Sequence, residues 1–133
     1  MIQVNYLAVL LAAVSAMVVG SLWYGPLFGN MWMKLIGISK SDINKSEMPK
    51  LYGIMFIGAL VEAYVLSHFI HYAGAYTLVN GIKTGVWAWL GFVATVMIGN
   101  YMFAKRPMNL FYIDCGYALV NLMIMGAIIA SMW

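Results

Sequence analysis

Charged residues are scarce in this sequence. Lysine, arginine, aspartate and glutamate make up 8% of its 133 residues, about a third of their share in soluble domains. Hydrophobic residues make up 65%, and a water-soluble fold of this length cannot bury so much apolar surface. These proportions exclude a soluble enzyme, a nucleic-acid-binding module and a disordered tail. They predict a protein whose surroundings are a lipid bilayer.

Cysteine, proline and recognisable catalytic motifs are also scarce. The single cysteine, Cys115, lies in an apolar run and cannot form an intramolecular disulfide. The three prolines, Pro26, Pro49 and Pro107, fall between apolar segments and mark their boundaries. The sequence has no phosphate-binding loop, nucleophile triad or zinc-ligand spacing. We therefore expect no cofactor and no metal, and an enzyme is the least favoured hypothesis because no acid–base pair faces water.

Four segments are long enough to cross a membrane as helices, which takes roughly 20 mostly apolar residues. They are residues 4–24, 51–72, 81–104 and 108–132. The predicted fold is all-α: one integral membrane domain over residues 1–133, with four transmembrane helices as two hairpins. A cleaved signal peptide is the alternative for the first segment. No basic residue precedes that segment, however, and its apolar run is too long for a signal core.

The connection after the first segment contains an apolar helical face. The spacing i, i+3, i+4, i+7, i+8 is followed by Phe28, Met31, Trp32, Leu35 and Ile36. This pattern predicts a short amphipathic helix in the membrane interface, where tryptophan and tyrosine are enriched. Trp23, Tyr24 and Trp32 are the predicted interfacial residues. A helix packed beneath the bundle is the alternative.

Basic residues are distributed unevenly between the connections. Only Lys83 borders the second connection, whereas six basic residues lie in the first and third: Lys34, Lys40, Lys45, Lys50, Lys105 and Arg106. The positive-inside rule places those two connections in the cytoplasm. The sequence therefore predicts a protein of the cell (inner) membrane with both termini outside.

Small residues recur at four-residue spacing in two of the segments, which lets helix backbones approach closely in lipid. The first segment carries Ala8, Ala12, Ala16 and Gly20, and the third carries Gly91, Thr95 and Gly99, preceded by Gly81 and Gly85. These stripes exceed what one small bundle needs, so they predict a homodimer or a subunit of a larger membrane complex. The alternative is that small residues are simply common in membrane helices.

A few polar residues interrupt the apolar segments. An ionised carboxylate at mid-bilayer costs roughly 2.5–3.5 kcal/mol, which makes Glu62 and Asp114 candidates for a ligand or proton site. Tyr117 and Asn121 share a helical face with Asp114. Depth along the helices pairs Glu62 with Asn121 and Asp114 with Asn100. Low dielectric disfavours the charged form of an isolated carboxyl, so we expect Glu62 to be protonated.

Two stretches of sequence, with several shorter ones, match a known pattern in order along nearly the whole chain. They are residues 20–29 followed by Trp32, residues 85–95, Arg106-Pro107, Leu110-Phe111, Gly116-Tyr117 and residues 125–128. Together they resemble the bacterial membrane family catalogued as domain of unknown function 1761. This chain has Gly25 where the family usually has serine, Ala104 where an acidic residue is usual, and Asp114 where asparagine is common. The resemblance implies a four-helix membrane protein and brings no activity with it.

Two functions from different classes follow from these observations. The first is a structural or accessory subunit in a membrane complex, in which every polar residue serves helix packing through interhelical hydrogen bonds. The second is a small proton-linked transporter, or a binder of an amphipathic or cationic molecule, that uses Glu62. The accessory role is ranked slightly ahead. A cavity between the second and fourth segments would favour the second function.

Overall fold

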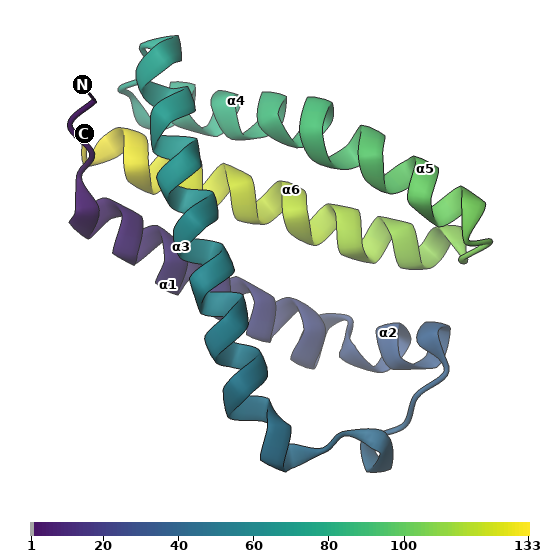
Figure 1. Ribbon diagram of the computed structural model, residues 1–133. Helices are drawn as coiled ribbons and strands as arrows, with labels where there is room; N and C mark the ends of the chain where they lie inside the picture. Colours follow the sequence, from purple (N-terminus) through teal and green to yellow (C-terminus); the bar gives the residue numbers. More distant parts are fainter. Residues whose placement is uncertain (1) are drawn as a thin grey trace.

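A computed structural model describes residues 2–133, and helices account for nearly all of the ordered backbone, with no strand in that range (Figure 1). The helices α1 (Tyr6–Leu22) and α2 (Gly29–Ile36) are joined by a π-helical turn, η1 (Trp23–Leu27). Two single 3-10 turns, η2 (Lys40–Asp42) and η3 (Lys45–Glu47), lead into α3 (Met48–Ala73). The rest comprises α4 (Leu78–Ala88), the π-helical η4 (Trp89–Ala94), α5 (Thr95–Phe103) and α6 (Met108–Ser131).

Four of the continuous helical units are long and apolar enough to cross a membrane: Tyr6–Leu27, Lys45–Ala73, Leu78–Phe103 and Met108–Ser131. The predicted set of four long apolar helices is therefore confirmed. A short helix, α2, also follows the first unit as expected. One boundary is wrong, because Gly25 and Pro26 do not end the first helix: they lie inside η1, which extends it to Leu27.

The ends of the helices follow local side-chain chemistry. Asn5 caps α1, its Oδ1 accepting hydrogen bonds from the backbone amides of Leu7 and Ala8 at 3.1 and 3.2 Å. Glycine in the left-handed conformation ends both α2, at Gly37 (φ 79°), and α3, at Gly74 (φ 63°). These caps satisfy backbone groups that the helix itself leaves unpaired.

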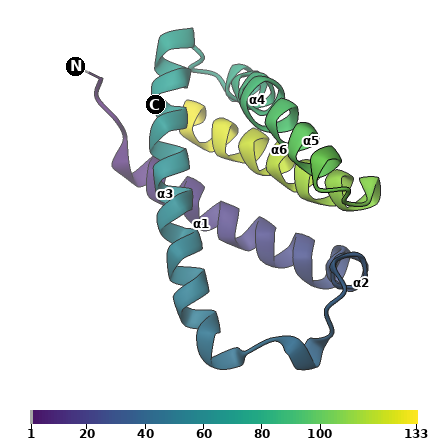
Figure 2. The ribbon, with the colours of Figure 1, turned by 45° about the vertical axis from the view of Figure 1, so that its right-hand side comes forward.

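The helices α1, α4–α5 and α6 lie side by side, and α3 crosses them steeply (Figures 1 and 2). Both termini and the α3–α4 connection lie toward one end of this group, whereas α2 and the α5–α6 turn lie at the other. The Nδ2 of Asn5 donates to the carbonyl oxygen of Met132 at 2.8 Å, which joins the two termini. The two basic connections thus share one end of the molecule, as two hairpins require.

The core depends on close backbone approach at small residues. Along α1, Ala8, Ala12 and Ala16 are at most 3% exposed, and Gly20 faces Tyr117 of α6. Between α4 and α6, a Cβ added to Gly81 would lie 2.2 Å from the Gly126 carbonyl oxygen. The predicted α1 stripe is therefore part of the packed core, together with a glycine contact between α4 and α6.

The other predicted stripe does not pack within the chain. Gly91 and Thr95 are exposed, and a Cβ added to Gly91 or Gly99 would meet no atom within 4 Å. The predicted role of this stripe in packing between protein chains stays a prediction. The seam of the third span is formed earlier in the helix by Gly81 and Gly85, and the stripe of Gly91, Thr95 and Gly99 faces outward.

Candidate functional site

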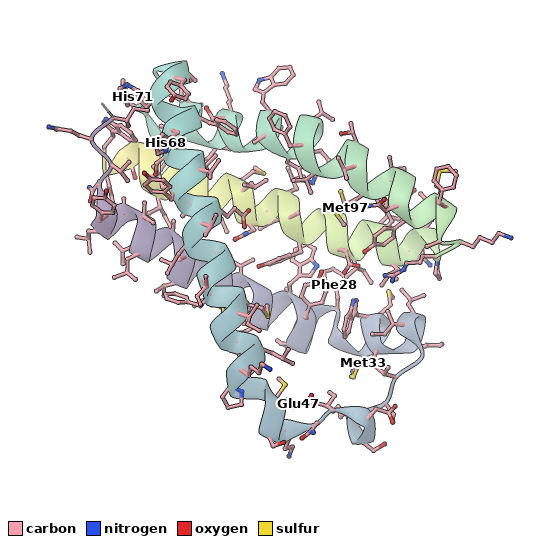
Figure 3. All side chains as sticks on the ribbon, in the orientation of Figure 1. Phe28, Met33, Glu47, His68, His71 and Met97 are labelled. Carbon is pink, nitrogen blue, oxygen red and sulfur yellow. The ribbon has the colours of Figure 1, made fainter. Side chains whose placement is uncertain are left out.

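A cavity of about 1160 Å³ lies where the first connection folds back beneath the bundle. One wall comes from the end of α1, η1 and α2, and the other from the start of α3. The connection between them closes the third side (Figure 1). Figure 3 labels Met33 on α2 and Glu47 on η3, which border this region. We refer to this space as the α1–α3 cavity.

The walls of the α1–α3 cavity are mainly apolar and adaptable. Four of the chain's 12 methionines contribute to it: Met17, Met33, Met48 and Met55. Trp32 and Tyr52 add aromatic surface from opposite walls. Unbranched methionine side chains fill irregular spaces and suit surfaces that receive variable apolar ligands. The cavity is therefore shaped to receive an apolar body.

Asp114 of α6 also lines this cavity, and two phenols hold its carboxylate. The Tyr24 hydroxyl donates to Oδ1 at 2.6 Å, and the Tyr101 hydroxyl donates to Oδ2. These bonds join η1 and α5 to α6 through one side chain. A carboxylate can accept about four hydrogen bonds, so Asp114 retains acceptor capacity beyond the two phenols.

The π-helical turn η1 explains how Tyr24 reaches α6. Its wider winding is marked by a bond from the Phe28 amide to the Trp23 carbonyl oxygen, five residues back, at 2.8 Å. The Trp23 Nε1 donates to the Ile113 carbonyl oxygen at 2.9 Å, which fixes the turn against α6. Figure 3 places Phe28 between this turn and α6, and its ring lies 4.8 Å from that of Trp23.

The aromatic residues predicted only as interfacial anchors thus have an additional role. Trp23 and Tyr24 are half-buried, and each donates a hydrogen bond to α6. Trp32 packs edge-on against Tyr24, with ring centroids 5.6 Å apart, and lines the cavity. Tyr117 packs edge-on against Tyr24 at 5.4 Å and donates to the Ala16 carbonyl oxygen at 3.2 Å. A single aromatic cluster therefore surrounds the Asp114 carboxylate.

The predicted pairing of Asp114 with Asn100 is wrong. Asn100 is exposed, and the partner of Asp114 on α5 is the next residue, Tyr101. The depth estimate placed Asp114 correctly beside the end of the third span. Phenols at matching depth in two spans, Tyr24 and Tyr101, were the sequence signal for this contact, because a carboxylate in an apolar segment needs donors.

The predicted pairing of Glu62 with Asn121 does not occur as a hydrogen bond among the residues described. Asn121 is buried, 3% exposed, and its Oδ1 has no hydrogen-bond donor there. Glu62 is half-buried on α3 and is not among the residues that line the α1–α3 cavity. Glu62 and Asp114 therefore belong to different surroundings.

Sequence reasoning missed Lys40 and Lys45 as site residues, because it used them only to orient the chain. Both are exposed and both line the α1–α3 cavity. Within residues 2–133, no three histidine, cysteine, aspartate or glutamate side chains gather as a metal site. The chemistry of the site is that of an apolar cavity with a carboxylate in its wall and ammonium groups at its rim.

Comparison with known proteins gives a family and no activity. No curated protein and no solved structure matches the chain. One family model matches residues 7–130, which is nearly the whole chain and includes the four long helices except for the first residue of the first and the last residue of the fourth, and every residue of the aromatic cluster. The chain therefore belongs to the family described as protein of unknown function DUF1761.

Proposed function

We propose that this protein spans the bacterial inner membrane and binds an amphipathic small molecule in the α1–α3 cavity. The observation that carries the proposal is the cavity itself, about 1160 Å³ in volume. Ligand sites are commonly cavities of about 300–1000 Å³ with apolar walls and a few placed polar groups. The α1–α3 cavity has this character, with Asp114 as the carboxylate in its wall.

The outer surface of the helices supports membrane insertion. Val18, Phe92 and Val96 are each more than half exposed on the outside of the bundle, and water would make such a surface prone to association. The two connections that carry six of the seven basic residues lie at the same end of the molecule. The positive-inside rule assigns that end to the cytoplasm and both termini to the outside.

The proposed site differs from the one that the sequence favoured. Of the two carboxylates expected as ligand or proton residues, Asp114 lines the cavity and Glu62 does not. The class of ligand remains the same, an amphipathic molecule, because the walls combine thioether and aromatic surface with a fixed carboxylate. Glu62 is left as a separate polar group on α3, available to a proton-linked step only if binding is coupled to transport.

Two neighbouring residues of α3 provide a matched test of ligand binding. Met55 lines the cavity and Ile54 does not, while both are about half exposed, at 51% and 58%. Met55→Trp places a bulkier side chain in the lining and should obstruct the cavity without disturbing the core, and Ile54→Trp should leave the cavity open. Native mass spectrometry of protein extracted gently from membranes should show an adduct on the wild type and on Ile54→Trp. Loss of that adduct is expected in Met55→Trp, and equal adducts on all three proteins would refute the proposal.

A second function, as a homodimer or a subunit of a larger complex, is favoured by the outward stripe of Gly91, Thr95 and Gly99. Open small residues on an outer helix face allow a second helix to approach closely. The double variant Gly91→Leu/Gly99→Leu should abolish a dimer measured by cross-linking in lipid nanodiscs. Gly53→Leu/Gly58→Leu on α3 is the control, because a Cβ at either position also meets no atom within 4 Å. An unchanged cross-linked fraction in the first variant would eliminate this stripe as an interface.

A further inference from the structure

We infer that the occupant of the α1–α3 cavity is an anionic lipid from the surrounding leaflet, its head group held by Lys40 and Lys45. This inference rests on the ligand-binding function proposed above and specifies the ligand's charge and source. It follows from the charge at the rim of the cavity and from the direction in which the cavity continues.

Two lysines line the rim of the cavity, whereas Asp42 and Glu47, the acidic residues nearest to them in sequence, are not among its lining residues. Lys40 and Lys45 both line it, and within residues 2–133 no carboxylate lies within 4.0 Å of either ammonium group. Asp42 lies between them in sequence, but its Oδ2 accepts from the backbone amide and hydroxyl of Ser39, at 2.8 and 3.1 Å. Its carboxylate therefore caps its own turn. An anionic group is the complement of this rim.

The one carboxylate in the wall is already satisfied in part. Both oxygens of Asp114 accept phenolic hydrogen bonds, from Tyr24 and Tyr101. Hydrogen bonds to the charged form stabilise a carboxylate where it lies and reduce its demand for a cationic partner. The balance of unpaired charge facing the cavity is thus positive, from Lys40 and Lys45.

The cavity continues as an apolar path toward the middle of the helices. A second hollow of about 430 Å³ shares Met17 and Ser21 with it and extends along α1 to Val14, with Phe56 of α3 opposite. From Ser21 to Val14 is about 10 Å along a helix. A molecule with its head at the lysines can therefore lay an acyl chain between α1 and α3.

This apolar extension favours a lipid over a small soluble anion. Its lining is almost entirely apolar, and two of the lining residues, Val18 and Leu22, are 53% and 52% exposed on the outside of α1. The hollow thus opens beside surface that lipid chains cover in the proposed orientation. The lysines lie in the cytoplasmic connection, at the level where anionic head groups attract basic side chains.

Trp32 provides a reporter for the test because it lines the cavity. Protein in neutral maltoside micelles is titrated with acyl-brominated phosphatidylglycerol, which is anionic, and with acyl-brominated phosphatidylcholine, which has no net charge. Bromine on an acyl chain quenches tryptophan at close range, and Trp32→Phe should remove the saturable part of the quenching. Brominated stearate and an alkyltrimethylammonium competitor complete the set of probes.

The lysines are tested with a charge-matched control. Lys40→Gln/Lys45→Gln should weaken phosphatidylglycerol binding about tenfold or more. Lys34→Gln/Lys50→Gln removes the same charge from the same connection at exposed positions outside the cavity lining, and it should change affinity by less than about threefold. Wild-type protein should bind phosphatidylglycerol more tightly than phosphatidylcholine, and the alkyltrimethylammonium should not displace it.

Several outcomes would overturn the inference. Three results would show that Lys40 and Lys45 do not recognise the charge of the head group. They are equal affinity for the two phospholipids, equal loss of affinity in the two lysine double variants, and displacement of the lipid by the alkyltrimethylammonium. Binding of stearate alone would show that the ligand is not a phospholipid of the leaflet. If Met55→Trp still removes the adduct seen by native mass spectrometry in any of these cases, the proposed binding function stands and only its ligand changes. If no probe gives saturable quenching at Trp32 and no adduct depends on Met55, both proposals fail.

Discussion

Gly85 tests whether the contact between α4 and α6 is as close as the structure indicates. An alanine Cβ at this position would lie 2.4 Å from the Leu122 carbonyl oxygen and 2.8 Å from its carbonyl carbon. Both are backbone atoms, so the helices themselves must separate. Overpacking of this kind costs about 1–3 kcal/mol. Gly85→Ala should therefore lower the free energy of unfolding despite the better helix propensity of alanine.

The control is Gly58→Ala on α3, where an added Cβ would meet no atom within 4 Å. That variant should gain up to about 1 kcal/mol from helix propensity alone. Because the propensity gain is common to both alanine variants, their stabilities should differ by the overpacking cost of about 1–3 kcal/mol, measured by equilibrium unfolding in the same mixed micelles. Equal stabilities would refute the close approach of α4 to α6 at Gly85.

Three further predictions concern the polar residues and the orientation. Tyr24→Phe and Tyr101→Phe should each lower the free energy of unfolding by about 1–2 kcal/mol, since each removes a hydrogen bond to the Asp114 carboxylate. Tyr112→Phe, at an exposed position, should not change it. Equal effects of the three substitutions would contradict the role of the two phenols. Glu62→Gln should change stability by less than about 1 kcal/mol, because an amide replaces a carboxyl that we expect to be neutral. A large loss of stability would show a charged, paired carboxylate. If the protein exchanges protons for a ligand, vesicle flux should stop in Glu62→Gln, and flux that survives would eliminate Glu62 as the carrier. Tags at both termini should react with membrane-impermeant reagents added outside the inner membrane, and reaction only after that membrane is permeabilised would reverse the orientation.

Helix number and order followed from the sequence because bilayer-length apolar runs leave few alternatives. The ends of the first helix were harder to predict. Gly25-Pro26 is a frequent helix terminator, yet here the chain continues as a π-helical turn in which the Phe28 amide reaches the Trp23 carbonyl oxygen. Such widened turns depend on tertiary contacts, here the bond from Trp23 to Ile113, and composition does not reveal them.

The sequence does not reveal how each helix is rotated about its own axis. This limited the prediction of which helix faces pack together and which polar residues pair. Gly85 and Gly91 are six residues apart, about 240° around a helix after full turns are removed, so two small-residue stripes on one span point in different directions. Spacing alone could not tell which stripe meets α6. The π-helical η4 follows Gly85 and shifts the register of everything beyond it. Depth therefore brought Asp114 to the end of α5, but rotation decided that Tyr101, and not Asn100, would bind it.

The α1–α3 cavity could not be predicted from the sequence, for a different reason. Its walls come from α1, α2 and α3, and its volume depends on the steep crossing of α3, which no local pattern encodes. Lys40 and Lys45 carried a topology signal in the sequence, and only the fold of the connection places them at the rim. Met17, Met33, Met48 and Met55 were likewise interpretable as packing residues until their common surface was visible.

Those four methionines permit the most direct test of the account. Methyl-labelled methionine nuclear magnetic resonance of the protein in micelles, titrated with phosphatidylglycerol, reports on the cavity and its surroundings at once. If a lipid occupies the α1–α3 cavity, saturable shifts and contacts to acyl protons are expected for Met17, Met33, Met48 and Met55. Met125, 0% exposed in the core, and Met102, 66% exposed on the outer surface, should not change in a saturable way. Unchanged cavity methyls, or equal gradual shifts of all methionines, would contradict a ligand site between α1 and α3.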